Sequence, residues 1–374
     1  MNLSDSFADV TFCDLSQGIA GPHATMLFAQ FGANIIKVEP PGGDWGRALG
    51  DQYGDHCIHS WYYNLGKRSV TLDLKGEASR EKLRTLIEAS DVFVESFRPG
   101  VAKRLGFSYD AVRSLRPDII YASVSGFGQT GPNSRRGTVD ALMQGFSGMM
   151  VMNRTPDGVP RRQNMVAVDV VTGLYLHVAI AAALAHRRAS GEGTYLDISL
   201  MQAAAAFQGA KIAEYAVSSG EGKLFYAPVG LLPTIDGAVS VSCRLQDHFV
   251  ALCERLKLQH VADERRFKNA QERVENNAEL MTILGKASAE YSTDVLLREL
   301  HAAGVFAEKV QSYGDWLSDS HVDAANAFHW VEVEGIGRLP LAHVPGLGTH
   351  RESSPRIGEH TSEVLLQGIE AATR

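Results

Sequence analysis

The feature that most constrains the fold is the alternation of short apolar runs with helix-like segments over the first 125 residues. Five runs are rich in β-branched and aromatic residues and are predicted strands: Val10–Ser16, Asn34–Glu39, Ser69–Leu74, Asp91–Ser96 and Asp118–Ser125. Helix-like segments lie between them at 24–31, 77–89 and 109–115. Strands joined in this way pair in parallel through right-handed crossovers. The pattern therefore predicts an α/β fold with a doubly wound parallel sheet.

Polar side chains follow the ends of these strands. Ligands of such sheets bind outside the carboxyl ends of the strands, which here carry Ser16–Gln17, Glu39, Asp73–Lys75, Ser96–Arg98 and Ser125–Gly126. We therefore expect a binding site at this edge of the sheet. The glycines at 18 and 21 do not complete a G-x-G-x-x-G fingerprint, so the usual sign of a dinucleotide site is missing. A tight strand-to-helix turn is the simpler explanation for these two glycines.

The second half of the chain predicts a separate domain. Strand-like Thr194–Leu200 is followed by an alanine-rich helix over Met201–Val217, and Ser218–Gly222 breaks that helix as a candidate linker. A further domain is expected to start near Tyr226, with a hairpin turn at Thr234–Gly237. Helices are expected at 247–258, 276–290, 293–303 and 313–326, and two short strands and a final helix in the tail. The length of 374 residues fits two or three domains.

Composition excludes several functional classes. A formal net charge of −7 argues against a nucleic-acid partner, because such proteins carry a basic excess. The first residues show no basic region followed by an apolar one, so no secretory signal is visible. The apolar run at 165–186 is interrupted by Asp169, Thr172 and His177, which indicates a core helix rather than a membrane span.

The cysteines point to the cytoplasm. Cys13, Cys57, Cys243 and Cys253 are scattered along the chain, and reduced thiols are the simplest account of them. The only crowding of metal-type side chains is His56–His59, with no matching second cluster. Structural metal sites need a full ligand set, so no metal site is predicted.

One carboxylate stands out in the segment Asn164–Gly193. Asp169 lies in an otherwise apolar run, just before a helix predicted over Thr172–Ala189. That helix has few polar faces, so we expect it to be buried against the rest of the protein. At its start, unpaired backbone N–H groups and the helix dipole favour a negative charge. Asp169 is therefore either an ordinary N-cap or a catalytic carboxylate.

These pieces together resemble the class III CoA-transferase family, also called CaiB/BaiF, which includes formyl-CoA transferases, carnitine CoA-transferases and α-methylacyl-CoA racemases. The resemblance covers nearly the whole chain. Each block is weak alone, but their order and spacing are specific. The blocks are Ala20–Pro22 with Gly32–Glu39, Gly66–Ser69 with Leu72–Lys75, Val94–Gly100 with Arg104–Gly106, Ser125–Pro132, the Asp169 segment as far as Gly193, and Gly358–Thr361.

The resemblance implies an interlocked homodimer. Each subunit of the family has a large Rossmann-like domain with a parallel sheet, built from both chain ends, and a smaller inserted α+β domain. In this sequence the large domain is expected over 1–200, completed by 330–374. A linker helix is expected over 201–225 and the small domain over 226–329.

The implied activity moves CoA from an acyl-CoA to a small carboxylic acid through a covalent aspartyl intermediate on Asp169. A carboxylate suits this role because its anhydride and thioester are about as reactive as the substrate, and a helix N-terminus can supply N–H donors to oxyanions. CoA is expected to be a substrate, with no tightly bound cofactor. Its phosphates and adenine are expected near Leu72, Lys75, Phe97 and Arg104, where basic side chains would pair phosphates. Ser96, Gln17 and Ile19 complete the predicted binding residues.

Departures from the family pattern reduce the number of activities within the family that this sequence fits. Where the racemases carry a histidine, directly before Asp140, this sequence has Val139, so half of the acid–base pair for proton exchange is lost. Ile19 stands where formyl-CoA transferases have a glutamine, with Gln17 two residues earlier, and no glycine-rich loop is visible between Leu224 and Val241. Oxalate specificity is therefore in doubt. Near the adenine, Arg135 and Arg136 precede Gly137, where some relatives have a lysine.

Three alternatives remain open from the sequence. A racemase or isomerase of the same fold is weakened by Val139. A nucleotide-dependent oxidoreductase is weakened by the missing glycine fingerprint. A non-catalytic CoA-binding protein is the third, because a fold does not dictate function.

Overall fold

A computed structural model describes residues 3–155, 157–218, 224–347 and 351–368. The chain divides into two compact units. The large unit comprises Met1–Ile212 with Ala327–Arg374, and the small unit comprises Ala213–Asn326. Each unit is described by itself.

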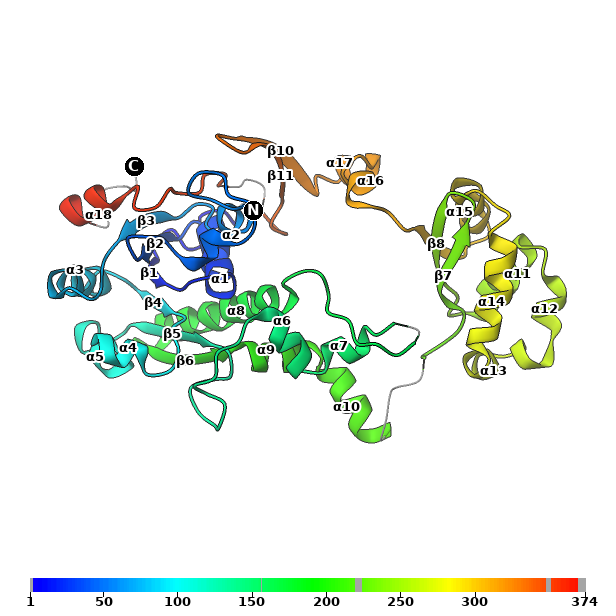
Figure 1. Cartoon of the computed structure of the whole chain (residues 1–374), viewed down its shortest axis with the longest axis horizontal. Helices are drawn as coiled ribbons and strands as arrows, with labels where there is room; N and C mark the ends of the chain where they lie inside the picture. Colours follow the sequence, from blue (N-terminus) through cyan, green and yellow to red (C-terminus); the bar gives the residue numbers. More distant parts are fainter. Residues whose placement is uncertain (1–2, 156, 219–223, 348–350, 369–374) are drawn as a thin grey trace. The chain divides into compact units, whose positions relative to one another are not determined.

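The large unit is built on a six-stranded parallel sheet, which confirms the predicted α/β class (Figure 1). The strand order is β3-β2-β1-β4-β5-β6, so the order reverses between β1 and β4, which is where ligands of doubly wound sheets bind. The strands are β1 (Thr11–Leu15), β2 (Asn34–Glu39), β3 (Arg68–Thr71), β4 (Val92–Glu95), β5 (Ile120–Ser125) and β6 (Thr194–Ser199). β3 ends three residues earlier than predicted, because 72–75 turns away toward the next helix.

Helices cover both faces of this sheet. On one face, α1 (Ala20–Gln30) and α8 (Ala167–Ser190) pack with apolar side chains of β1, β2, β4 and β5. On the other face lie α3 (Glu77–Glu88), α5 (Tyr109–Leu115) and α18 (Thr361–Gln367). Because both faces are covered, the strands can be continuous apolar runs, which is why they were readable from the sequence.

Shorter helices complete the large unit. They are the 3₁₀ turn η1 (Trp45–Ala48), α2 (Ile58–Tyr63), α4 (Val101–Leu105), α6 (Asp140–Phe146), α7 (Met149–Met152) and α9 (Leu200–Phe207). The next helix, α10 (Gly209–Ser218), begins in the large unit and ends in the small unit, which starts at Ala213. The single helix expected over Met201–Val217 is wrong, because α9 ends at a C-cap, Gln208, before α10 begins. Gly209 follows directly, and glycine is a poor residue for a helix interior.

Helix α8 is buried against the rest of the large unit, as expected, but on one face only. Leu176 and Ile180 are completely buried, whereas Leu174 is 46% and Val178 is 63% exposed. By length and composition alone, α8 is also apolar enough to cross a membrane. That is weak evidence, since a core helix of a soluble protein passes the same test, and α8 packs on α1 and the sheet.

The C-terminal segment closes the β3 edge of the sheet. The Gly358 N–H donates to Ser69 Oγ at 2.8 Å, and the His360 N–H donates to the Ser69 carbonyl at 2.9 Å. The Thr71 N–H donates to Thr361 Oγ1 at 3.0 Å. A hairpin of β10 (Phe328–Val333) and β11 (Gly337–Ala342) packs nearby on α1 and α2.

The small unit contains a three-stranded antiparallel sheet packed on helices. Its strands are β7 (Val229–Thr234), β8 (Gly237–Ser242) and β9 (Phe306–Lys309), with the predicted hairpin between β7 and β8. Its helices are α11 (Gln246–Arg255), α12 (Gln259–Asp263), η2 (Arg265–Phe267), α13 (Ala270–Glu275), α14 (Asn277–Ser288), α15 (Thr293–Ala302), α16 (Tyr313–Leu317) and α17 (Ser320–Ala324). The single helix expected at 313–326 is wrong, because Asp319 caps a new helix.

Candidate functional site

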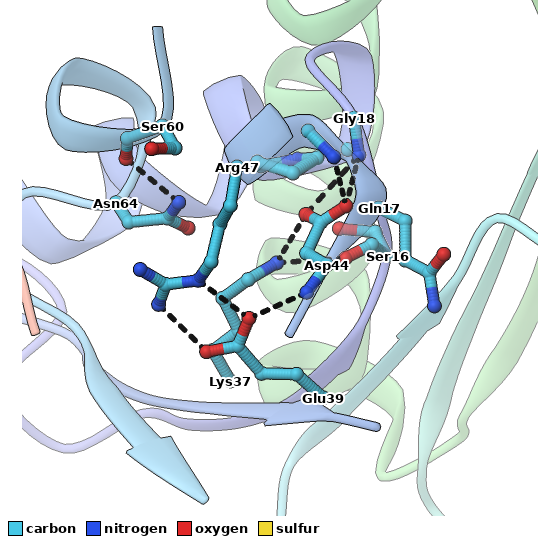
Figure 2. Close-up of polar contacts among 12 residues, drawn as sticks. Ser16, Gln17, Gly18, Lys37, Glu39, Asp44, Arg47, Ser60 and Asn64 are labelled. Carbon is cyan, nitrogen blue, oxygen red and sulfur yellow. Dashed lines mark hydrogen bonds and ion pairs between the residues drawn. The ribbon is translucent and has the colours of Figure 1, made fainter. Parts of the chain in front are cut away.

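Three buried ion pairs lie at the carboxyl ends of β1 and β2. Lys37 Nζ donates to Asp44 Oδ2 at 2.9 Å, and Arg47 pairs with Glu39 at 2.7 Å (Figure 2). Lys67 Nζ lies 3.2 Å from Asp14 Oδ2. Each of these six side chains is at most 4% exposed. Buried charges are tolerated only when paired and hydrogen-bonded, so this network must form as a whole.

The network holds the loop between β1 and α1. Asp44 Oδ1 accepts the Gly18 N–H at 2.9 Å, and Lys37 Nζ donates to the Ser16 carbonyl at 2.9 Å (Figure 2). Gly18 has a φ of +79°, and a Cβ there would lie 2.3 Å from the Trp45 ring. Only glycine fits this position. The buried charges therefore fix the backbone that carries Gln17.

The pKa shifts in the network follow from its charges. Burial alone would raise the pKa of Asp14, yet Lys67 and Lys37 hold that pKa below its ordinary value. Burial opposes ionisation of Glu39 as well, but the hydrogen bonds and charge of Arg47 lower its pKa to about 2. These two carboxylates are therefore ionised at neutral pH. Burial lowers the pKa of Lys67 to about 7.

An open groove lies at this same edge of the sheet, with a volume of about 580 Å³ that is partly open to solvent. Its walls come from the ends of β1, β2 and β3 and from the residues after β4. The lining residues are Leu15, Gln17, Val38, Glu39, Pro40, Leu72, Asp73, Leu74, Lys75, Phe97 and Leu105. Four predicted binding residues, Gln17, Leu72, Lys75 and Phe97, are thus brought together from three separate segments.

The other predicted binding residues lie outside the groove lining. Ser96 is not among the residues that line the groove, but its Oγ accepts the N–H of Gln17, which does line it, at 2.8 Å. Ile19 is 4% exposed at the N-cap of α1, so its side chain is buried rather than presented to a ligand. Arg104 is exposed on α4, one residue before Leu105, which does line the groove.

Asp169 lies in the first turn of α8 and is partly buried. It is not the N-cap, because Val166 holds that position. The cap is supplied by Asp140, the first residue of α6, whose Oδ2 accepts the N–H of Val168 at 2.7 Å and of Asp169 at 3.2 Å. These two N–H donors are therefore occupied by the Asp140 carboxylate.

The environment of Asp169 favours its neutral form. Burial raises its pKa to about 7, and the Asp140 carboxylate adds to the rise. Asp140 is itself fixed by Gln144, whose Nε2 donates to its Oδ1 at 2.6 Å. A carboxylate of raised pKa is more basic and more nucleophilic once ionised.

Helix α8 approaches α1 closely near Asp169. A Cβ on Gly173 would lie 2.8 Å from the Ala20 carbonyl oxygen and 2.6 Å from His23 Nδ1. His23 Nδ1 donates to the Val170 carbonyl at 3.1 Å, and burial lowers the pKa of His23 to about 4. The β1–α1 loop and the first turn of α1 thus connect the groove, through Gln17, with the turn that carries Asp169.

A model of CoA-transferase family III matches residues 7–361. The chain belongs to this family. It is 31% identical to a succinate–glutarate CoA-transferase of Agrobacterium fabrum, over 98% of this chain and 96% of the relative. It is 34% identical to an acetyl-CoA:oxalate CoA-transferase of Acetobacter aceti, over 80% and 79%.

Solved structures agree with the family assignment. A CAIB/BAIF family protein from Brucella suis is similar, with a TM-score of 0.83 and 29% identity over 95% of this chain and 97% of that chain. Rv3272 from Mycobacterium tuberculosis gives a TM-score of 0.86 with 26% identity over 97% and 99%. As a member of CoA-transferase family III, the protein is an enzyme that moves CoA from an acyl-CoA to a carboxylic acid.

Several residues of the buried ion-pair network were not singled out from the sequence. Asp14, Lys37, Asp44 and Lys67 were not singled out, because their partners lie in separate segments and leave no local pattern. Lys67 does lie within the family-like block Gly66–Ser69, which is the one sign of its role in the sequence. Val139, which the sequence predicts to stand where racemases carry a histidine, is 49% exposed and offers no ionisable group. Among the described residues, no group of three or more His, Cys, Asp or Glu side chains could hold a metal ion.

Proposed function

We propose that this family III enzyme transfers CoA between small dicarboxylic acids through a covalent intermediate on Asp169. Asp169 Oδ attacks the thioester carbonyl carbon, the carbon–sulfur bond breaks, and the CoA thiolate leaves a mixed anhydride. The thiolate then attacks the Asp169 carbonyl and releases the donor acid, leaving an aspartyl-CoA thioester. The acceptor carboxylate reverses these steps and regenerates Asp169. The supporting observation is a partly buried carboxylate of raised pKa in the matched position, on a turn connected to the groove.

The dicarboxylate class is proposed from the names of relatives. Besides the Agrobacterium protein, relatives include succinyl-CoA:mesaconate CoA-transferases of two Haloarcula species, at 29% and 30% identity. CoA itself is proposed to bind the groove, with Lys75 pairing a phosphate and Phe97 beside the adenine. We propose a cytoplasmic enzyme, since all four cysteines are free thiols.

The assembly is proposed to be an interlocked homodimer. Large apolar side chains are exposed on α6, α8 and α9, including Leu142 at 62%, Val178 at 63% and Phe207 at 59%. These helices contact one another, and extensive exposed apolar surface is typical of a protein interface. Sedimentation velocity that shows an active monomer at working concentrations would overturn this proposal.

The covalent step is tested by replacing Asp169 with Asn. Wild-type protein incubated with succinyl-CoA should gain the mass of an acyl or CoA adduct that hydroxylamine removes. Asp169→Asn should form no adduct and lose more than about a thousandfold in turnover, the usual cost of losing a nucleophile. Because burial raises the Asp169 pKa to about 7, the wild-type acylation rate should rise with pH through about 7 and level off above it.

Asp110→Asn is the matched control, because Asp110 also lies in the first turn of a helix but is exposed. It should behave as the wild type. Turnover by Asp169→Asn above about a thousandth of the wild-type rate would overturn the covalent role. Deuterium entering the α-position of a chiral 2-methylacyl-CoA in heavy water, without acceptor acid, would instead favour a racemase.

A further inference from the structure

Glu95 is a buried carboxyl group that the proposed reaction does not use. It is the last residue of β4 and is 3% exposed. Its Oε2 accepts the Phe97 N–H at 2.7 Å, and its Oε1 accepts the Ser123 hydroxyl. Ser123 Oγ in turn accepts Gln129 Nε2 at 2.9 Å. Both carboxyl oxygens are therefore occupied by fixed donors from β5 and from the turn after β4.

Within the part of the chain that the structure describes, no lysine or arginine forms an ion pair with Glu95, and the like charge of Asp197 on β6 acts on it. Burial raises the pKa of Glu95 to about 7. An apolar residue would fill this position at a lower cost in desolvation. The position is thus unfavourable for stability alone, which is typical of groups at functional sites.

The contacts of Glu95 lead directly to the groove. Phe97, whose N–H it holds, lines the groove. Ser96, between the two, accepts the Gln17 N–H through Oγ at 2.8 Å, and Gln17 lines the groove as well. The Glu95 carboxyl therefore restrains two wall residues on different segments, one directly and one through Ser96.

We propose that Glu95 is a positioning residue for CoA: it fixes the Ser96–Phe97 turn so that Phe97 and Gln17 are in place before CoA enters the groove. This inference rests on the proposed CoA site. A preformed groove wall strengthens CoA binding because fewer side chains and backbone segments lose conformational entropy when CoA binds. Glu95 does not contact the reacting atoms, so its loss should weaken CoA binding and leave the chemical step unchanged.

The test compares Glu95→Leu with Glu95→Gln. Leu removes the acceptor of the Phe97 N–H, whereas Gln keeps a carbonyl oxygen that can accept it. The dissociation constant for free CoA, measured by titration calorimetry, should rise about tenfold in Glu95→Leu, the cost of one lost backbone hydrogen bond. It should stay within about twofold in Glu95→Gln. KM for succinyl-CoA should follow the same pattern while kcat at saturation stays constant.

Ser90→Ala is the control for stability, because Ser90 is equally buried and its hydroxyl donates to the Leu86 carbonyl at 2.6 Å, remote from the groove. It should lower the melting temperature without changing CoA binding. Equal CoA binding by wild type, Glu95→Leu and Glu95→Gln would overturn the inference. Absence of CoA binding by the wild type would instead overturn the proposed CoA site.

A second variant covers the case in which Glu95→Leu does not fold. Glu95→Asp keeps the acid but is one methylene shorter, so it cannot reach the Phe97 N–H and Ser123 together. The CoA dissociation constant of Glu95→Asp should then rise severalfold. An unchanged value in this folded variant would count against the positioning role.

Discussion

Buried carboxyl groups are stabilised in two different ways at the two halves of the sheet's carboxyl edge. At β1 and β2, Asp14, Glu39 and Asp44 each pair with a lysine or arginine. At β4, the donors that Glu95 finds among the described residues are neutral: the Phe97 amide and the Ser123 hydroxyl. The ion pairs and the Glu95 hydrogen bonds each fix a backbone segment that lines the same groove.

The difference has opposite electrostatic consequences. Arg47 lowers the pKa of Glu39 to about 2, whereas burial without a cation raises the pKa of Glu95 to about 7. Glu39, in the β1–β2 half, is therefore ionised at every pH near neutrality. The β4 half changes its protonation near pH 7. Burial alone does not determine whether a carboxyl group is charged; the neighbouring donors do.

The largest expected effect is the loss of a cation from the charged half. Lys37→Met leaves Asp44 buried without its partner, which should lower the free energy of unfolding by about 3–5 kcal/mol in urea titrations. Glu95→Leu should cost distinctly less, because it leaves no orphaned charge. Equal decreases in the free energy of unfolding for Lys37→Met and Glu95→Leu would contradict the difference between the ion-paired and the neutral carboxyl groups.

The contributions of Glu39 and Glu95 to stability should depend on pH with opposite signs. The pKa of Glu39 is lowered from 4.5 to about 2, so its contribution to stability is present above pH 4.5 and is lost as the pH falls toward 2. The pKa of Glu95 is raised from 4.5 to about 7, so its contribution is present below pH 4.5 and is lost as the pH rises toward 7. Each change is on the order of 3 kcal/mol.

The measurement is the melting temperature of Glu39→Gln and Glu95→Gln relative to wild type, from pH 3 to 8. The melting temperature of Glu39→Gln should fall furthest below that of the wild type above pH 5. The melting temperature of Glu95→Gln, measured against the wild type, should be most favourable at pH 8. The groups facing Glu95 that also titrate or carry charge are Asp197, Tyr121 and Tyr195. If the melting-temperature differences of the two variants from wild type changed with pH in the same direction, the predicted opposite signs would be contradicted.

The smallest expected effect comes from two matched serines. Ser69 and Ser123 are both buried, and each donates to a glutamate while accepting one N–H. Ser69→Ala should cost about 1.5–3 kcal/mol because its partner Glu39 is charged, and Ser123→Ala about 1 kcal/mol near pH 6, where Glu95 is largely neutral. Urea unfolding at pH 6 gives both values, and the reverse order would be inconsistent with a neutral Glu95.

Much of the fold was predictable because its signals are local. Buried parallel strands are continuous apolar runs, so β1, β2, β4 and β5 were found close to their observed bounds. The strand ends then placed Gln17, Lys75 and Phe97 on one edge, where they line the groove. The end of β3 and the break after Phe207 depend on turns and caps, whose signals are weaker than the apolar pattern.

The remaining features depend on contacts between distant segments. Asp140 caps α8 from a different helix, so the carboxylate at the helix start was misread as a possible cap. The charged residues of β1 and β2 look ordinary in the sequence, since Asp14 finds Lys67 only in the folded chain. The exposed face of α8 was missed for a related reason: an apolar pattern shows that a face avoids water but not what covers it.

The closure of β3 by the C-terminal segment has a consequence for synthesis on the ribosome. Ser69 and Gly358, which meet in that closure, are 289 positions apart. At typical elongation rates the second residue emerges roughly 15 to 60 s after the first. During this interval the small unit, encoded between them, can already fold, while the β3 edge offers unpaired backbone groups to any neighbouring chain. The nascent large unit is therefore most exposed to mispairing just before its last helix leaves the exit tunnel.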